Sequence, residues 1–492
     1  MIRKARVVVA SLVLLAITAM FLDYTGTLHE YFSWLAKIQF LPAVLAINVG
    51  VIIGLVALTA IFGRLYCSVI CPLGIFQDVL GKVLKLNGKS WKQHKYRFSY
   101  SPAKSILRYV MLGLLVIAIV AGINIIVTLL APYSMYGKFV STLFAPVMKV
   151  VSMGVEYIDE RLGTYLIYPN DVVLSGGLAC IFGVLFIALC IVASKNGRTY
   201  CNTICPVGTV LGFISKYSLL KIQIDTEKCK NCGLCEKRCK SSCLNAKEHK
   251  IDYSRCIACF DCIDECRHGA VSYALRKNST KAQNVDEGKR AFVTGVALAV
   301  GASAVKAQHK TVDGGYATII GKSVPPRTTA PVPAGSGSIS NMERHCTSCQ
   351  LCITACPNRV LSPSQELGSF MQPRMSFDKG FCRVGCTACS DVCPAGAINK
   401  IQKEEKTAIA VGQAIWIADN CIAVSKDENC GNCARHCPSG AIEMVVREGV
   451  SAKAVPVVNT EKCIGCGACE HVCPSRPISA IYVEGYKEHH IR

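Results

Sequence analysis

Charged residues are scarce in this chain. Asp, Glu, Lys and Arg make up 18% of its 492 residues, against roughly 25% in soluble domains. Hydrophobic residues reach 51%, and the mean hydropathy is +0.36. This composition argues against one water-soluble core. A chain of this length usually folds into about three domains. We therefore expect a membrane domain joined to separate modules.

Several cofactor and catalytic motifs are absent. No Cys-x-x-Cys-His occurs, so covalent c-type haem is not expected. No Gly-x-Gly-x-x-Gly follows a candidate strand, and residues 315–323 are one residue too long for a phosphate loop. No nucleophile, base and acid stand in a recognisable pattern, so the sequence assigns no catalytic residue.

Acidic residues are the scarcer charged class, and the net charge is +21. The chain also has 31 cysteines, and thiolates that hold a metal are anionic, so they would offset much of this excess. Residues 63–108 hold nine Lys or Arg against one acid, Asp78. Such a loop between apolar runs is a topology signal, and no nucleic-acid partner is expected.

Four apolar runs are long enough to span a lipid bilayer: residues 7–22, 41–62, 109–132 and 172–193. The basic clusters beside them predict that both ends of this domain face the cytoplasm. Residues 139–155 are a candidate fifth span. We expect them instead to form a helix lying flat in the outer leaflet. The predicted fold is an α-helical membrane domain of four helices plus an anchor helix, with α/β ferredoxin-like modules.

A twelve-residue motif follows the second and fourth runs. Residues 63–74 read GRLYCSVICPLG and residues 197–208 read GRTYCNTICPVG, with eight identical positions. Two copies of one helix-end motif should face the same side, which keeps residues 131–171 outside. Two interpretations of their cysteines stay open: a shared redox or metal centre, or reduced thiols at helix ends. The cysteines are Cys67, Cys71, Cys201 and Cys205.

Two runs of the form Cys-x2-Cys-x2-Cys-x3-Cys lie between residues 229 and 266. In this ferredoxin spacing three close thiolates hold one [4Fe–4S] cluster, and the fourth serves the other cluster. Zinc knuckles pair two Cys-x2-Cys units instead. Lys240 follows Cys239 where Pro is usual, so Cys243 is an alternative ligand. The predicted sets are Cys229, Cys232, Cys235 with Cys266, and Cys256, Cys259, Cys262 with Cys239.

A second block repeats this pattern twice. The spacings after Cys382 and Cys421 depart from the plain rule, whereas the runs that follow them are intact. Six clusters are predicted in total, and Cys180 and Cys190 are interpreted as small residues of an apolar helix. The four further sets are Cys346, Cys349, Cys352 with Cys393; Cys382, Cys386, Cys389 with Cys356; Cys421, Cys430, Cys433 with Cys473; and Cys463, Cys466, Cys469 with Cys437.

Residues 285–308 join the two cysteine blocks. Lys289 and Arg290 precede an apolar Gly/Ala-rich stretch similar to a twin-arginine export signal. A surface helix and a cleaved signal are the alternatives. The expected domains are 1–215 (membrane), 216–280 (dicluster ferredoxin), 285–308 (anchor helix), 309–340 (linker) and 341–484 (four clusters).

Residues 1–275 resemble the NapH-type membrane ferredoxin proteins, through the paired Gly-Arg-x-Tyr-Cys-x3-Cys-Pro motifs and the dicluster block. Residues 288–480 resemble the NapG-type four-cluster partner, through the residues 421–438 among others. The chain thus resembles both partners joined end to end. This implies an electron-transfer subunit of a quinol dehydrogenase-type system in the bacterial cytoplasmic membrane, with its C-terminal domain in the periplasm.

The resemblance also implies the partners, which are the lipid bilayer, the quinol pool with a bound quinone, and an extracytoplasmic redox protein. A different function remains open, namely redox maintenance or assembly of a metalloenzyme with cytoplasmic electrons. Reduction by quinol favours the first function. Reduction only by a cytoplasmic ferredoxin or flavodoxin favours the second.

Six four-cysteine sets predict about 24 iron atoms and about 24 acid-labile sulfides per chain purified without oxygen. Metal analysis together with sulfide determination checks this. A value near 16 would remove two clusters, with the sets containing Cys382 and Cys421 the first candidates. Zinc in place of iron would contradict the assignment of clusters.

Overall fold

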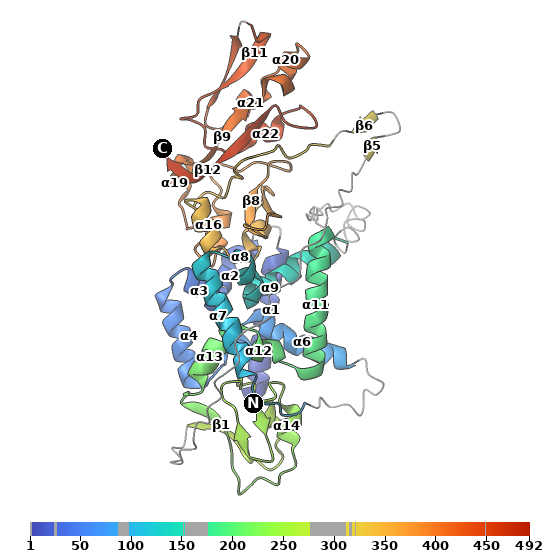
Figure 1. Cartoon of the computed structure of the whole chain (residues 1–492), viewed down its shortest axis with the longest axis vertical. Helices are drawn as coiled ribbons and strands as arrows, with labels where there is room; N and C mark the ends of the chain where they lie inside the picture. The colour runs from blue at the N-terminus through green and yellow to red at the C-terminus, as the bar shows by residue number, and fades with distance from the viewer. Residues whose placement is uncertain are drawn as a thin grey trace.

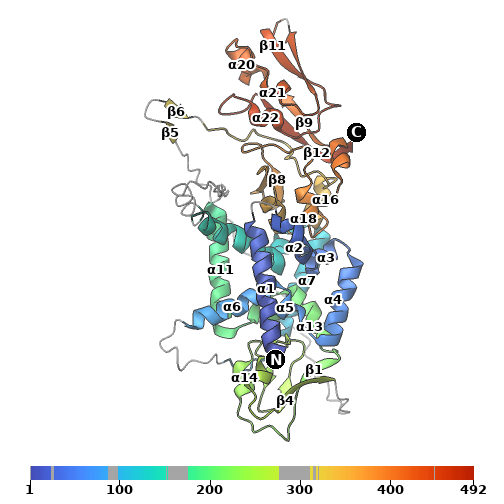
Figure 2. The ribbon, with the colours of Figure 1, turned by 180° about the vertical axis from the view of Figure 1, so that it is seen from behind.

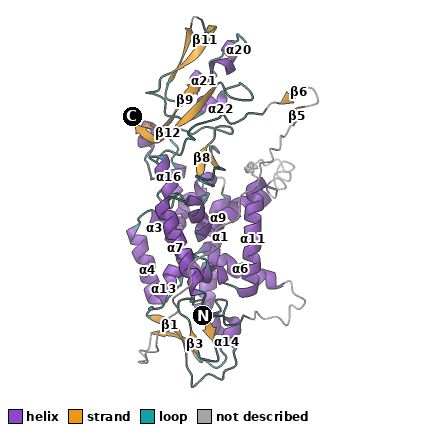
Figure 3. Ribbon diagram, viewed as in Figure 1, coloured by secondary structure: helices purple, strands orange, loops and turns teal. Residues whose placement is uncertain are grey.

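The computed structural model describes residues 2–23, 27–86, 98–150, 152, 176–275, 311–313, 317–319, 321–447 and 449–492. Three parts follow one another along the longest axis (Figure 1). A helical domain occupies the middle, and the strands gather at its two ends (Figure 3). We call the strand-containing parts the first ferredoxin module (residues 220–275) and the second ferredoxin module (residues 321–492).

The helical domain forms because long apolar runs must satisfy their backbone groups internally. Helices α1, α4, α7 and α11 run along its length, and the other helices lie among and beside them (Figure 1). The elements are α1 (Ile2–Leu22), α2 (Thr27–Lys37), α3 (Phe40–Leu45), α4 (Val49–Phe62), α5 (Tyr66–Val69), α6 (Pro72–Leu86), α7 (Ser105–Ala121), α8 (Asn124–Leu130), α9 (Pro132–Phe139), η1 (Val140–Phe144), α11 (Gly176–Asn196), α12 (Thr199–Thr203) and α13 (Pro206–Ser215).

Among the described residues, two helices are long and apolar enough to cross a membrane, α1 and residues 176–194 of α11. The other two predicted spans are each divided. The run 41–62 breaks between α3 and α4, where Ile47 has φ 52° and Asn48 caps α4 by accepting from Val51 N. The run 109–132 breaks at Gly122, whose left-handed φ of 71° ends α7. Four uninterrupted spans were therefore the wrong expectation for these two runs.

Residues 132–150 form α9, η1 and a further helical stretch. All eight residues of α9 are buried inside the helical domain, and of these only Phe139 belongs to the flat helix predicted at 139–155. Residues 145–150 are helical and expose Val147 and Val150, which fits a surface helix over that short stretch only. Within the predicted flat helix, residues 151 and 153–155 lie outside the described residues.

The first ferredoxin module contains two antiparallel strand pairs, β1 with β4 and β2 with β3, and two short helices. It is fixed to the helical domain by buried arginines. Arg64 Nη1 and Arg108 Nη2 both donate to the carbonyl oxygen of Ser254, at 3.0 and 3.2 Å. The elements are β1 (Leu220–Ile224), α14 (Leu234–Arg238), β2 (Leu244–Asn245), β3 (Lys250–Ile251), α15 (Asp261–Glu265) and β4 (Val271–Leu275).

The second ferredoxin module has two longer antiparallel pairs, β9 with β12 and β10 with β11. Strand β12 ends at Ile491, beyond the predicted domain limit of 484. Its elements, with the preceding β5 (Thr311–Asp313) and β6 (Ala317–Ile319), are α16 (Ile339–His345), α17 (Leu351–Thr354), β7 (Leu361–Pro363), β8 (Pro373–Met375), α18 (Ala388–Val392), α19 (Lys403–Ala408), β9 (Ile409–Trp416), η2 (Ala418–Asn420), α20 (Ile422–Ser425), α21 (Asn432–Arg435), β10 (Ile442–Arg447), β11 (Ser451–Val458), α22 (Ala468–Val472) and β12 (Ile481–Ile491).

The predicted linker 309–340 is in part a packed segment. Arg327 is bonded to Glu470 and to the Val483 carbonyl, and Pro331 packs against Gly485. Residues 331–336 are buried. The anchor helix predicted at 285–308 lies outside the described residues.

The second ferredoxin module shares one hydrophobic core with the helical domain. Ser134 of α9 donates to the Thr347 carbonyl, and Thr128 bonds Ser348 at 3.2 Å. Gly137 has no side chain, and a Cβ there would lie 2.4 Å from the Cys349 carbonyl oxygen. In the view from behind, α18 lies beside α2 at one end of α1, and the first ferredoxin module lies at the other (Figure 2).

Candidate cluster sites and a four-cysteine centre

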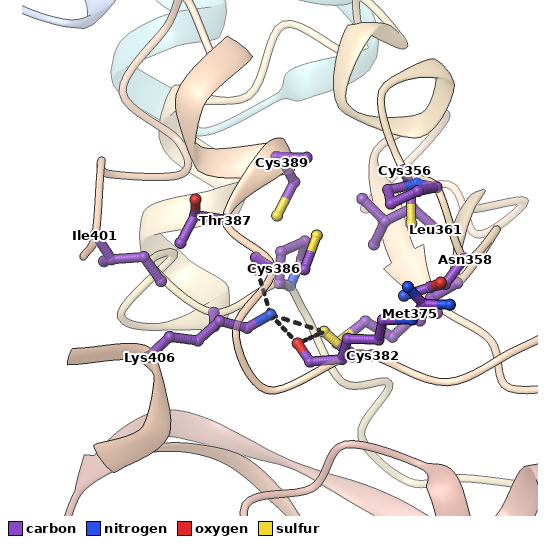
Figure 4. A pocket seen from close by; sticks show the side chains of 16 residues that line it. Cys356, Asn358, Leu361, Met375, Cys382, Cys386, Thr387, Cys389, Ile401 and Lys406 are labelled. Atoms are coloured by element: carbon purple, nitrogen blue, oxygen red, sulfur yellow. Dashed lines mark hydrogen bonds between the residues drawn. The ribbon is translucent and has the colours of Figure 1, made fainter. Parts of the chain in front are cut away.

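One predicted cluster set lines a cavity within the second ferredoxin module. Cys356, Cys382, Cys386 and Cys389 all line it, with apolar neighbours such as Leu361. Figure 4 shows their sulfur atoms arranged around this space. Four thiols around an apolar cavity are a donor set that fits a [4Fe–4S] core. The irregular Cys-x3-Cys spacing at Cys382 therefore does not prevent convergence.

Lys406 is a neighbour of this cavity that the spacing rule did not suggest. Its Nζ lies 3.3 Å from Cys382 Sγ and donates to the carbonyl oxygens of Arg383 and Cys386 (Figure 4). Burial raises the pKa of the Cys382 thiol, and the Lys406 ammonium opposes that shift. A cation at a ligand sulfur favours the thiolate that a cluster needs.

The set nearest the helical domain is Cys346, Cys349, Cys352 and Cys393. These four lie close enough together for a charge on one thiol to act on the others. Lys138 of α9 lies beside Cys346 and Cys349 and is fully buried. Its Nζ donates to the Thr128 carbonyl at 3.0 Å. No carboxylate among the described residues lies within ion-pair distance of Lys138.

The last two sets lie in the distal half of the second ferredoxin module. Burial raises the pKa of Cys433 to about 11, and neighbouring Cys430, Cys473 and Cys421 add to the shift. Burial likewise raises the pKa of Cys466 to about 12, with Cys463 and Cys437 contributing. The thiols of each set therefore gather as the ligand-exchange rule predicts. A metal core that binds such thiols replaces their protons, which are released to water.

Neighbouring sets in this module touch in a fixed order. Cys389 lies near Cys352, which joins the first two sets. Cys382 N donates to the Cys466 carbonyl at 2.9 Å, which joins the Cys382 set to the Cys463 set. Cys469 of the Cys463 set lies near Cys433 of the Cys421 set. The four sets thus form one line leading away from α9.

The first ferredoxin module holds the remaining two sets. Cys235 lies near Cys229 and Cys232, and Cys266 packs against the same small core. Cys239, Cys243, Cys256, Cys259 and Cys262 line one cavity. Cys239 Sγ and Cys243 Sγ are 3.6 Å apart, so both thiols reach this site. Either can serve as its fourth ligand.

The two Cys-x3-Cys-Pro motifs meet inside the helical domain. All four thiols are buried and free, and they lie close enough together to interact electrostatically. Gln77 Nε2 lies 3.2 Å from Cys201 Sγ, which links α6 of one motif to the cysteine of the other. We call Cys67, Cys71, Cys201 and Cys205 the four-cysteine centre.

Cys180 is exposed and Cys190 is half-buried on α11, as expected for small residues of an apolar helix. Within the described residues, no group of three His, Cys, Asp or Glu side chains is tight enough for a single metal ion. A cubane spreads its ligands over four corners and needs no such tight group. Lys138, Lys406 and Gln77 are the neighbours that sequence reasoning missed, because each reaches its site through tertiary packing.

Two family models match this chain. One, described as a 4Fe-4S binding domain, matches residues 44–90 and 178–225, each of which contains one Cys-x3-Cys-Pro motif. The other, described as a 4Fe-4S dicluster domain, matches residues 345–415 and 428–476. The prediction of ferredoxin-type [4Fe–4S] domains is confirmed. The number of clusters and their individual ligands remain predictions.

Several curated proteins are related to parts of the chain. An uncharacterised protein of Methanocaldococcus jannaschii is 35% identical over 25% of this chain and 54% of its own length. YccM of Escherichia coli, assigned provisionally to electron transport, is 23% identical over 48% and 58%. The ferredoxin-type protein NapH of Haemophilus influenzae is 35% identical over 16% and 30%. The chain thus spans just over half the length of the first two relatives, and the NapG-type half of the resemblance stays a prediction.

A Cys382 variant tests directly whether the irregularly spaced cysteine is a cluster ligand. Replacing Cys382 by Ser should remove about four iron atoms per chain, because one cubane loses a ligand. The Cys180→Ser variant is the matched control and should keep its full iron content. Iron analysis and electron paramagnetic resonance of the reduced proteins measure both. Unchanged iron in the Cys382 variant would show that this cysteine is not a ligand.

Proposed function

We propose that this chain is a membrane-anchored electron-transfer protein that connects the quinol pool to an extracytoplasmic redox partner through [4Fe–4S] clusters. One observation carries this proposal. Four-cysteine sets lie at both ends of one helical domain, two in the first ferredoxin module and four in the second (Figure 1). A domain that spans a bilayer with clusters at both ends is suited to carry electrons across it.

The surface of the helical domain supports its placement in a bilayer. Large apolar side chains are exposed along the helices, including Leu12 and Leu15 of α1, Val120 of α7 and Val184 of α11. Apolar surface on this scale needs a lipid or protein cover. Arg64 and Arg108 bond Ser254 of the first ferredoxin module, and Lys82 lines a cavity beside that module, which supports a cytoplasmic position for this end.

A cavity of about 230 Å³ supports a quinol site. It lies between α1, α6 and the first ferredoxin module, with Val7, Ala10 and Val79 on its apolar side. On its polar side, Gln77 Oε1 and Arg6 Nε are buried without a partner among the described atoms. The cavity therefore has an apolar side and a charged side, which suits an amphipathic headgroup. The charged residues of its wall are Arg3, Arg6, Asp78, Lys82, Arg238, Lys240 and Asp261.

The reaction balances with these partners. Oxidation of one quinol gives a quinone, two protons and two electrons, and each electron reduces one cluster by one unit of charge. The partner outside is the oxidant. The protons leave on the side where the cavity opens. The cavity wall includes Lys240 and Asp261 of the first ferredoxin module, so a bound quinol would lie next to the set that contains Cys259.

The alternative proposal is redox maintenance of a metalloenzyme with cytoplasmic electrons. The first ferredoxin module favours it in one respect, since Cys232 is exposed and offers a soluble donor direct access. Quinol and a soluble ferredoxin can be tested as reductants side by side. Reduction by ferredoxin alone supports this alternative.

The proposal predicts that the second ferredoxin module lies outside the cytoplasm. A site-specific protease sequence inserted between residues 314 and 315 should be cut in intact spheroplasts. The native Arg327 is a poor protease site because it is buried against Glu470. The same insertion within residues 87–97, in the basic loop, is the control and should be cut only after lysis. Changing Lys289 and Arg290 to Gln should protect the first site if export depends on them.

Gel electrophoresis of the protease-treated chain shows which insertion was cut. Protection of both insertions in the wild-type background until lysis would place all clusters on the cytoplasmic side. The extracytoplasmic partner would then be ruled out.

Filling the cavity should block quinol. The Ala10→Trp variant adds an indole to the buried cavity wall and should lower the rate of cluster reduction by a quinol at least tenfold. Reduction by dithionite should be unchanged. Leu12→Trp is the matched control, because Leu12 is 61% exposed on the same helix. Equal quinol rates in both variants would place the quinol elsewhere.

A further inference from the structure

The two repeats of the helical domain hold each other by a reciprocal exchange. Arg64 of the first repeat donates to the Cys201 carbonyl of the second at 3.2 Å. Arg198 of the second repeat donates to the Cys67 carbonyl of the first at 2.6 Å. Both guanidinium groups have no exposed surface. The centre is therefore built by both repeats together and not by either alone.

The glycines of the motifs permit this approach. A Cβ on Gly74 would lie 2.5 Å from the Cys67 carbonyl oxygen and 2.6 Å from Arg198 Nη1. A Cβ on Gly208 would lie 2.2 Å from the Cys201 carbonyl oxygen and 2.8 Å from Arg64 Nη2. In each repeat, the glycine thus leaves room for the cysteine carbonyl of its own motif and for the arginine of the other motif. Such matched packing around four thiols indicates a site and not two helix ends.

The charges at the centre call for an anion. Arg198 is paired with Asp78, whose carboxylate also bonds Lys240. Arg64 has no carboxylate partner among the described ion pairs and instead contacts Cys67 Sγ at 3.7 Å. A buried guanidinium facing neutral thiols is strongly unfavourable. Four thiolates around an iron–sulfur core would supply the missing negative charge.

The four-cysteine centre also lies between the two ferredoxin modules, where an electron relay would be needed. Arg6 of α1 donates to the carbonyl of Ser68, next to Cys67. Phe21 of the same helix packs on Gly137, which abuts Cys349 of the second ferredoxin module. Arg6 and Phe21 are 15 residues apart, or about 22 Å along an α-helix. On the other side, Arg64 joins the centre to Ser254 in the loop before Cys256.

We propose that Cys67, Cys71, Cys201 and Cys205 hold a seventh [4Fe–4S] cluster, which relays electrons between the two ferredoxin modules. The inference deepens the proposed function and rests on it, because it supplies the step between the two ends of the helical domain. Each transfer moves one electron, so the cluster is reduced by a neighbouring reduced cluster or quinol and is reoxidised by the set that contains Cys349. No bond to the protein forms or breaks in this exchange.

Iron content distinguishes the proposal from its alternatives. The whole protein should contain about 28 iron atoms, four more than six clusters supply. Cys71→Ser and Cys205→Ser should each remove about four iron atoms. The double variant should lose no more than either single variant, because both cysteines serve one cluster. Cys190→Ala is the control and should keep all the iron.

Three outcomes would overturn the proposal. These are unchanged iron in both single variants, additive losses in the double variant, and one zinc ion per chain at this site. Retention of the spectra of the other six clusters in each variant shows that the chain still folds. The proposed function has its own readout, which is electron transfer from one module to the other in the wild type. If the protein contains about 28 iron atoms but this transfer does not occur, the proposed function is rejected and the seventh cluster still stands.

Gln77 gives a second test that leaves the ligands in place. The Gln77→Met variant removes the donor to Cys201 Sγ while keeping a side chain of similar size. Hydrogen bonds to cluster sulfurs raise the reduction potential, so one signal should move to lower potential. The iron content and the other signals should not change. If no signal moves, Cys201 is not a cluster ligand and the proposal fails.

Discussion

Two buried guanidinium groups hold this molecule together. Arg64 and Arg198 lie among apolar helices, and each bonds the backbone of the opposite repeat. A buried charge is costly unless it is paired. Asp78 pairs with Arg198, and the thiolates of the proposed cluster would pair with Arg64. Arg64 further bonds Asn202 and Ser254, so the same side chain fixes the repeat and the first ferredoxin module. The centre, the domain and the module are therefore set by one network.

The sequence predicts the cluster sets because ligand exchange between paired runs is a local rule, and the assignment of each ligand stays a prediction. The irregular sets also converge, as the cavity around Cys356 and Cys382 shows. The cations beside them could not be predicted. Lys406 and Lys138 reach their thiols from other elements, and no spacing in the sequence relates Lys138 to Cys349, which lies more than 200 residues away.

The helical domain was predicted less well, because hydropathy measures apolar length but not continuity. Gly122 and Asn48 are standard signals for the end and the start of a helix, and they divide two of the runs. The repeat motif was the better guide. It predicted that the two cysteine pairs share one side, and the structure brings all four thiols together. It could not predict that α9 enters the core, since that depends on Cys349 lying against Gly137.

The contact at Gly137 bears on how electrons would leave the helical domain. A module joined only by a flexible linker would hold its clusters at varying distances, and electron transfer falls steeply with distance. Here Ser134 and Thr128 bond the loop that carries Cys346 and Cys349, and Gly137 allows the backbones to touch. The first set of the line is thereby fixed against α9. The buried Lys138 at that contact would offset the negative charge of a cluster there. Helix α9 would therefore both hold the second ferredoxin module in place and balance the charge of its first cluster.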